Sequence, residues 1–260
     1  MNAPTLPNLP PIWREGRASL EAAALLRSPV WRGEDVPDGE GQPVLLIPGF
    51  LAGDGSLGLM TRWLRRTGHH TRKAGIRANV NCSGDSVEPL VKRLETLAER
   101  HGQRVAIIGQ SRGGQFARVL AVRRPDLVSG IVTLGTPSLE RSALHPLVRA
   151  QVLAVGVLGT LGVPGLFRTS CWRGDCCTEF AEQLTGPFPG DVGFLGVYSK
   201  TDGIVSWRSC LDPAADAHME VRASHVGMSA NPEAFEAVAE SLDRFRRADL
   251  AGSPPVAVAA

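Results

Sequence analysis

The sequence predicts an α/β protein with a mostly parallel central sheet that is flanked by helices. Short apolar runs of strand length alternate along the chain with amphipathic, helix-like segments, which is typical of a parallel sheet covered on both faces. Glycine and proline follow several of these runs, where a strand would end. The chain has 260 residues, of which 43% are hydrophobic and 21% charged, so it can bury a sizeable core in one domain.

The elements are expected in the following order. Residues 1–40 form an N-terminal arm that is helix-like from 17 to 27, and residues 41–250 form the main domain. The first strand covers residues 43–47, because an apolar run there ends at Pro48-Gly49. A helix at 57–66, a short strand at 71–76 and an amphipathic helix at 86–101 follow, the last with apolar residues three and four positions apart.

The second half continues this alternation. A β-branched strand at 104–109 precedes a helix at 112–124 that Pro125 stops. Asn231 is expected to cap the closing helix before Pro232. We expect strands at 127–135, 193–199 and 218–222, the closing helix at 232–246 and a disordered tail at 251–260.

Residues from about 138 to 190 contain no clear strand and are expected to form a helical insertion over one end of the sheet. Their apolar run, Val152–Phe167, contains four glycines and Pro164 and is too short and interrupted to span a membrane. Two interpretations of the insertion remain open. It forms a cap or lid that lines or covers an acyl pocket, or it is a helical hairpin that completes the core.

The composition excludes some functions. The formal net charge is +2, which argues against a nucleic-acid partner, and the scattered arginines are expected on a solvated surface. The N-terminus has no basic region followed by an apolar one, so we expect no secretory signal. These features predict a soluble, cytoplasmic protein without a transmembrane segment, although peripheral contact with lipid is compatible with them. The oligomeric state is left open.

The first chemical signal is the sequence GQSRG at residues 109–113, which fits the pattern Gly-x-Ser-x-Gly. The motif directly follows a buried strand and opens an amphipathic helix, the setting that a nucleophile elbow requires. Gly109 and Gly113 leave room for the strained turn, and the helix N-terminus favours a developing negative charge. Ser111 is therefore the predicted nucleophile; the alternative is an ordinary glycine-rich turn.

A serine hydroxyl needs a base, and the base needs an acid to orient it. Of the histidines after Ser111, His225 follows the last strand, at the same sheet end as the serine, whereas His145 lies in the insertion and His218 begins a strand. Asp202 follows the strand at 193–199 and is the predicted acid. Its competitors, Asp212 and Asp216, lie in a polar loop without a preceding strand. The order Ser111, Asp202, His225 is the order found in α/β-hydrolases.

Ester hydrolysis also needs two amides that face the oxyanion. The N–H of Arg112 directly follows the nucleophile. The N–H of Phe50 lies in the loop after the first strand, and we expect it to be the second donor. The alternative for this Pro-Gly-Phe segment is a simple turn.

Five segments together resemble bacterial esterases and lipases of the α/β-hydrolase superfamily, including the lipase-like branch with the inositol-deacylase relatives. They are PGF (48–50), GQSRGG (109–114), LGTP (134–137), TDGIV (201–205) and SHVGM (224–228). The resemblance covers residues 42–247. It departs from the common pattern at Pro48, where many lipases have His, and at Gln110, where His is usual.

The resemblance implies a serine hydrolase that cleaves a small-molecule or lipid ester through an acyl-enzyme on Ser111, without a metal or organic cofactor. A thioesterase or acyltransferase with the same triad, or a silent binding protein of the same fold, are the alternatives. Fold alone does not decide among these.

The five cysteines are expected to be free thiols in a reducing compartment. Cys171, Cys176 and Cys177 form a cluster in the sequence, and a local disulfide, with Cys82 or Cys210 as a partner, is the alternative for an exported protein. No nearby histidine completes a known zinc-ligand spacing, so the sequence predicts no metal site.

Overall fold

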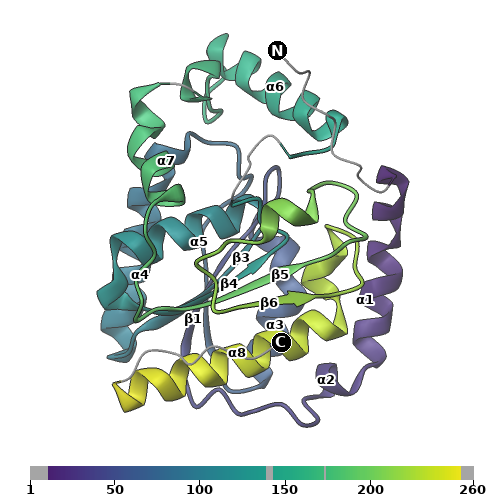
Figure 1. The fold of residues 1–260 in the computed structure, drawn as a ribbon, viewed down its shortest axis with the longest axis vertical. Helices are drawn as coiled ribbons and strands as arrows, with labels where there is room; N and C mark the ends of the chain where they lie inside the picture. Colours follow the sequence, from purple (N-terminus) through teal and green to yellow (C-terminus); the bar gives the residue numbers. More distant parts are fainter. Residues whose placement is uncertain (1–10, 139–142, 173, 253–260) are drawn as a thin grey trace.

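The computed structural model describes residues 11–138, 143–172 and 174–252. Within them, six parallel strands form one sheet in the order β2-β1-β3-β4-β5-β6. Figure 1 shows this twisted sheet with helices packed on both sides. The strands are β1 (Pro43–Ile47), β2 (His70–Lys73), β3 (Val105–Gln110), β4 (Val128–Leu134), β5 (Gly193–Tyr198) and β6 (Ala217–Glu220).

The four inner strands are buried along almost their whole length, whereas the edge strands β2 and β6 are partly exposed. This difference follows the sequence, because β1, β3 and β4 are rich in Val, Leu and Ile and β2 is His-Thr-Arg-Lys. Side chains alternate between the two faces: Val44 and Leu46 belong to one core cluster, Leu45 and Ile47 to the other.

Each face of the sheet has its own set of helices. One core cluster joins α1, α2, α3 and α8 to the sheet, and the other joins α4, α5 and α7 to its opposite face. The helices are α1 (Ala18–Arg27), α2 (Pro29–Arg32), α3 (Gly58–Arg66), α4 (Ser83–His101), α5 (Arg112–Arg123), α6 (Pro146–Thr160), α7 (Thr178–Thr185) and α8 (Pro232–Ala251).

The expected elements are confirmed, with shifted ends. The strand expected at 71–76 ends at Lys73, the last residue that pairs with β1, and Gly75 follows at φ 76°. The closing helix extends five residues past Arg246 to Ala251, and Gly252 in the left-handed conformation ends it. Its predicted cap is confirmed, since the side chain of Asn231 accepts a hydrogen bond from the Ala234 N–H.

The predicted disordered tail at 251–260 begins with a helical residue, and from 253 on it lies outside the described residues. The apolar run in the insertion, Val152–Phe167, forms the second part of α6 and the segment after it. Among the described residues, no helix combines the length and the apolar character that a membrane span requires.

The insertion divides into two parts. Helix α7 sits against α5, and its Phe180 and Leu184 belong to the core cluster of the main domain. Helix α6 lies apart from the sheet, at the top of Figure 1, and has several exposed apolar side chains, among them Leu153 and Leu158. Helix α7 therefore completes the core of the main domain, whereas the segment from α6 to Trp172 packs through a separate, smaller cluster.

Candidate active site

The carboxyl ends of the parallel strands bring the predicted catalytic residues to one edge of the sheet. Ser111 directly follows β3, Asp202 lies four residues after β5, and His225 lies five residues after β6. The chain reverses its direction of strand addition between β1 and β3. A crevice at such a switch point is where open α/β sheets bind ligands.

Ser111 occupies a strained turn between β3 and α5, with φ 52° and ψ −119°. A Cβ at Gly109 would lie 2.4 Å from the carbonyl oxygen of Gly113, and a Cβ at Gly113 would lie 2.1 Å from that of Ile47. The two predicted elbow glycines are therefore required by close backbone packing. Such strain at a non-glycine residue is characteristic of functional sites.

Asp202 and His225 form a buried pair. The Oδ2 of Asp202 lies 2.6 Å from the Nδ1 of His225, and the two residues are only 2% and 6% exposed. The other oxygen, Oδ1, accepts hydrogen bonds of 2.8 Å from the amides of Ile204 and Val205. With both oxygens engaged, the carboxylate holds the Nδ1 edge of the imidazole and leaves Nε2 available to the substrate.

The pKa of His225 is shifted upward. Burial alone lowers the pKa, because it disfavours the imidazolium, but the charge of Asp202, the hydrogen bond to it and the charge of Glu15 outweigh this effect. The site therefore stabilises the protonated imidazole, the form that a general base adopts after it has removed a proton.

Ser111 and His225 line the same cavity, which has a volume of about 1030 Å³. In this conformation no hydrogen bond joins the Ser111 hydroxyl to the imidazole among the described contacts. Nucleophile–base contacts are often long in structures without substrate. The insertion contributes apolar side chains to the cavity wall, including Val152, Leu153 and Phe167.

The two predicted oxyanion donors also border this cavity. Arg112 is the first residue of α5, where the helix N-terminus leaves amides free to bind an anion. The loop with Phe50 approaches the nucleophile closely, since a Cβ at Gly49 would lie 3.3 Å from the Cβ of Ser111. Asn79 fixes this loop by donating a hydrogen bond of 2.8 Å to the Pro48 carbonyl.

Two acidic residues of the N-terminal arm hold the loops that carry the acid and the base. Glu15 accepts hydrogen bonds from the amides of Gly203, His225 and Val226 at 2.9 to 3.0 Å. Glu21 accepts from the amide of Ser224 at 2.9 Å and from its hydroxyl at 2.6 Å. Sequence patterns do not reveal this role, because the partners are 188 to 211 residues away and are mostly backbone groups.

Gln110 is a further residue whose role the sequence does not indicate. Its side-chain amide donates a hydrogen bond of 3.1 Å to the carbonyl oxygen of His225. The residue that departs from the usual lipase elbow thus connects the nucleophile's strand to the base's loop. Its amide nitrogen is a donor, which suits a carbonyl partner.

The competing residues have other partners. Asp212 forms a buried salt bridge of 2.8 Å with Arg118, and Asp216 accepts a hydrogen bond from the Phe194 amide. His145 caps α6 through its ring nitrogen, and His218 lies in the edge strand β6. The buried Arg118 also shows that not every arginine lies on the solvated surface.

No protein-family model matches the sequence. Among solved structures, the lipase BlEst2 of Bacillus licheniformis in its mature form is similar, with a TM-score of 0.58 and 15% identity over 79% of this chain and 94% of that one. A soluble variant of the Saccharomyces cerevisiae monoglyceride lipase, in complex with a substrate analogue, has a TM-score of 0.59 and 15% identity over 81% and 89% of the two chains.

The chain has the α/β-hydrolase fold. A monoacylglycerol lipase of Paleococcus ferrophilus shares it, with a TM-score of 0.55 and 17% identity over 81% of this chain and 97% of that one. So does tomato methylketone synthase I, in complex with 2-tridecanone, with a TM-score of 0.53 and 12% identity over 79% and 99% of the chains. The α/β-hydrolase fold is thus shared by proteins named for different activities.

Proposed function

We propose that the protein is a serine hydrolase that cleaves carboxylic esters through an acyl-enzyme on Ser111. The observation that carries the proposal is the buried Asp202–His225 pair, 2.6 Å apart, in one cavity with a serine at a strained elbow. Three residues from separate strands in this arrangement match the roles of nucleophile, base and orienting acid. The fold neighbours named as lipases support the reaction class.

In the proposed mechanism, the Nε2 of His225 removes the proton of the Ser111 hydroxyl as its oxygen attacks the ester carbonyl. Asp202 holds the imidazole through Nδ1 and stabilises the imidazolium that forms. The N–H groups of Phe50 and Arg112 donate hydrogen bonds to the oxyanion of the tetrahedral intermediate. When the C–O bond to the alcohol breaks, His225 returns the proton to the leaving oxygen, and Ser111 is left acylated.

Water completes the cycle with the same groups. His225 removes a proton from a water molecule, the resulting hydroxide attacks the acyl carbonyl, and the tetrahedral intermediate collapses to the carboxylic acid as His225 protonates the oxygen of Ser111. The apolar wall supplied by α6 and Phe167 would receive the acyl chain. We therefore propose an ester with an apolar acyl group as the substrate class, and the segment from α6 to Trp172 as its cap.

Initial rates on p-nitrophenyl esters of increasing chain length test this function. We expect turnover by the wild type, loss of turnover in Ser111→Ala, and unchanged turnover in Ser19→Ala, which removes an exposed hydroxyl on α1. Faster acyl release from an acyl-CoA than from every ester would favour the thioesterase alternative. A folded wild type that turns over neither class would contradict the proposal and favour a binding protein.

A further inference from the structure

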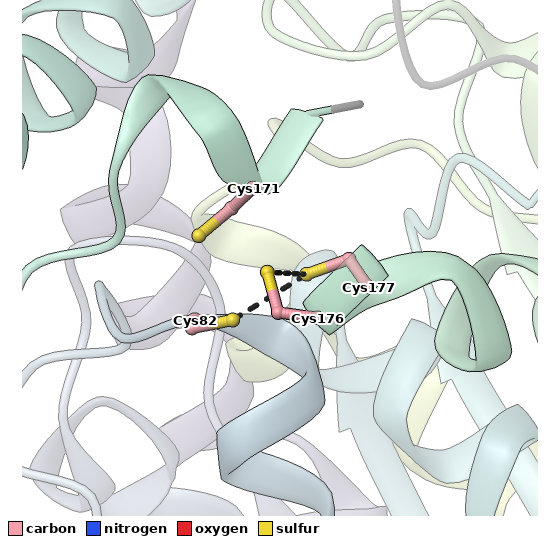
Figure 2. A group of neighbouring side chains, drawn as sticks. All are labelled: Cys82, Cys171, Cys176 and Cys177. Carbon is pink, nitrogen blue, oxygen red and sulfur yellow. Dashed lines mark hydrogen bonds between the residues drawn. The ribbon is translucent and has the colours of Figure 1, made fainter. Parts of the chain in front are cut away.

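Four of the five cysteines come together beside the cavity, although the chain separates them by up to 95 residues. The sulfurs of Cys82, Cys171, Cys176 and Cys177, here termed the cysteine cluster, all lie within 4.8 Å of one another. The Sγ of Cys177 is 3.4 Å from that of Cys82 and 3.8 Å from that of Cys176. Figure 2 shows the four sulfurs gathered in one place from three segments of the chain.

These separations suit a metal ion with four thiolate ligands. A zinc ion binds sulfur at about 2.3 Å in a tetrahedron, which places the sulfurs about 3.8 Å apart. We propose that the cysteine cluster binds one zinc ion in a closed, structural site with four sulfur ligands. Binding would release the thiol protons to solvent, since the thiolate is the ligand.

The surrounding backbone is shaped to bring the ligands together. Cys82 is the residue before the first turn of α4, and the 3-10 turns Thr169–Trp172 and Asp175–Cys177 carry the other three. A Cβ at Gly84 would lie 1.8 Å from the carbonyl oxygen of Cys176. Only glycine at this position lets the turn that carries Cys176 and Cys177 pack directly on the first turn of α4, next to Cys82.

A positive charge lies beside the cluster and has no carboxylate partner among the described residues. The guanidinium of Arg112 donates hydrogen bonds to the carbonyl oxygens of Asn79 and Asn81 and to the Ser83 hydroxyl. Burial lowers the pKa of Arg112 to about 10, and negative charge on the sulfurs of Cys177, Cys82 and Cys171 acts in the opposite direction. A zinc ion with four thiolates carries a net charge of −2, so Arg112 would balance part of it.

Disulfide bonds are the competing use of the same residues. All five cysteines are free in the structure, and two disulfides would pair the sulfurs rather than hold all four at one point. The fifth cysteine, Cys210, does not join the cluster. The sequence prediction of no metal site considered only the spacing around residues 171–177, and it treated Cys82 as a disulfide partner rather than as a fourth ligand. The fold brings Cys82 to the cluster from the start of α4.

The position of the site indicates what the ion would do. The hydrophobic cluster between the insertion and the main domain has five buried members, and two of them are cysteines: Val80, Cys82, Val155, Phe167 and Cys177. A core this small contributes little stability by itself. The metal would link the turns at Thr169–Trp172 and Asp175–Cys177 to the loop before α4, which Arg112 contacts. The proposed acyl pocket would thereby keep its wall in place.

Metal analysis tests the inference without any assay of activity. Untagged protein, purified under reducing conditions with zinc present, is expected to contain one zinc per chain by mass spectrometry of the metal. Cys176→Ser and Cys171→Ser should lose the ion, and Cys210→Ala should keep it. Both serine variants alter side chains that are not fully buried, and circular dichroism checks that they fold.

Two further measurements do not depend on variants. Cobalt(II) in place of zinc should give the intense visible absorption of a tetrahedral thiolate site. A mercurial that modifies thiols should release one zinc per wild-type chain, measured with a colorimetric chelator. Reduced wild type that takes up neither zinc nor cobalt would overturn the inference. So would intact masses of the isolated protein showing that the four cysteines are paired as disulfides.

Discussion

The main domain and the cap segment from α6 to Trp172 are held together in different ways. The main domain has a parallel sheet whose inner strands are buried, with a large apolar cluster on each face. The cap segment has a small cluster, four neighbouring cysteines and an exposed apolar surface on α6. We propose a division of roles, in which the main domain positions the reacting groups and the cap segment determines which acyl group enters.

The largest expected effect comes from a substitution in the main domain that does not alter the cap segment. In Asp202→Asn, Oδ1 can keep its two amide hydrogen bonds, but the side-chain NH₂ then faces Nδ1 of His225 and favours the wrong tautomer. The corresponding change in other triads lowers kcat by about 10⁴-fold. Steady-state kinetics on a short ester measures it. A loss below tenfold, with the fold intact, would contradict the role of Asp202.

The second prediction separates the stability of the domain from its chemistry. Phe235 of α8 is fully buried and contacts Trp63 of α3 at a ring-centroid distance of 4.8 Å. Phe235→Ala should lower the free energy of unfolding by about 3–5 kcal/mol, because it leaves a cavity. Urea unfolding at low temperature measures this cost, and the activity per folded molecule should change little. A variant with wild-type stability would show that packing of Phe235 in this core does not contribute to the free energy of unfolding.

The third prediction concerns the cap. Removal of the zinc, or Cys176→Ser, should raise KM for long-chain esters by roughly tenfold, a loss of about 1.4 kcal/mol of binding typical of a disturbed apolar pocket. The acetate ester should be nearly unaffected, since it needs little of the cap wall. Paired kinetics on the two esters measures the contrast. Equal losses on both esters would mean that the cysteine cluster supports the catalytic residues rather than the cap.

The smallest expected effect comes from a substitution at the contact between Glu15 of the N-terminal arm and the loop of His225. The charge of Glu15 raises the pKa of His225, and His225 must be neutral to act as a base. The activity should therefore fall as the pH drops through a pKa above 6.5, and Glu15→Gln should move this fall to lower pH. The pH profile of kcat/KM measures the shift, with Glu34→Gln, an exposed change elsewhere, as the control. A shift to higher pH would contradict the assignment.

Much of the fold follows from local patterns in the sequence. The buried strands, the elbow glycines and the cap at Asn231 are each determined by a few neighbouring residues, so periodicity and turn chemistry predict them. The ends of elements were less predictable, as the early end of β2 after Lys73 shows. Strand ends depend on where the neighbouring strand stops, which the local sequence does not specify.

The site was predictable only as far as its residues follow strands. Ser111, Asp202 and His225 lie after separate strands, and parallel topology then places them at one edge. Glu15 and Cys82 have no such signal, because their partners are distant in the sequence and are reached only after folding. Contacts of this kind require the packed structure.

The most direct test of the account is stoichiometric labelling with a fluorophosphonate, followed by intact mass measurement. An activated serine reacts with this probe through its oxygen, so the wild type should gain one adduct per chain, located by peptide mapping at Ser111. Ser111→Ala should gain none, and Ser19→Ala should label like the wild type. A folded wild type that stays unlabelled, or a Ser111→Ala variant that labels as fast as the wild type, would contradict the proposed nucleophile.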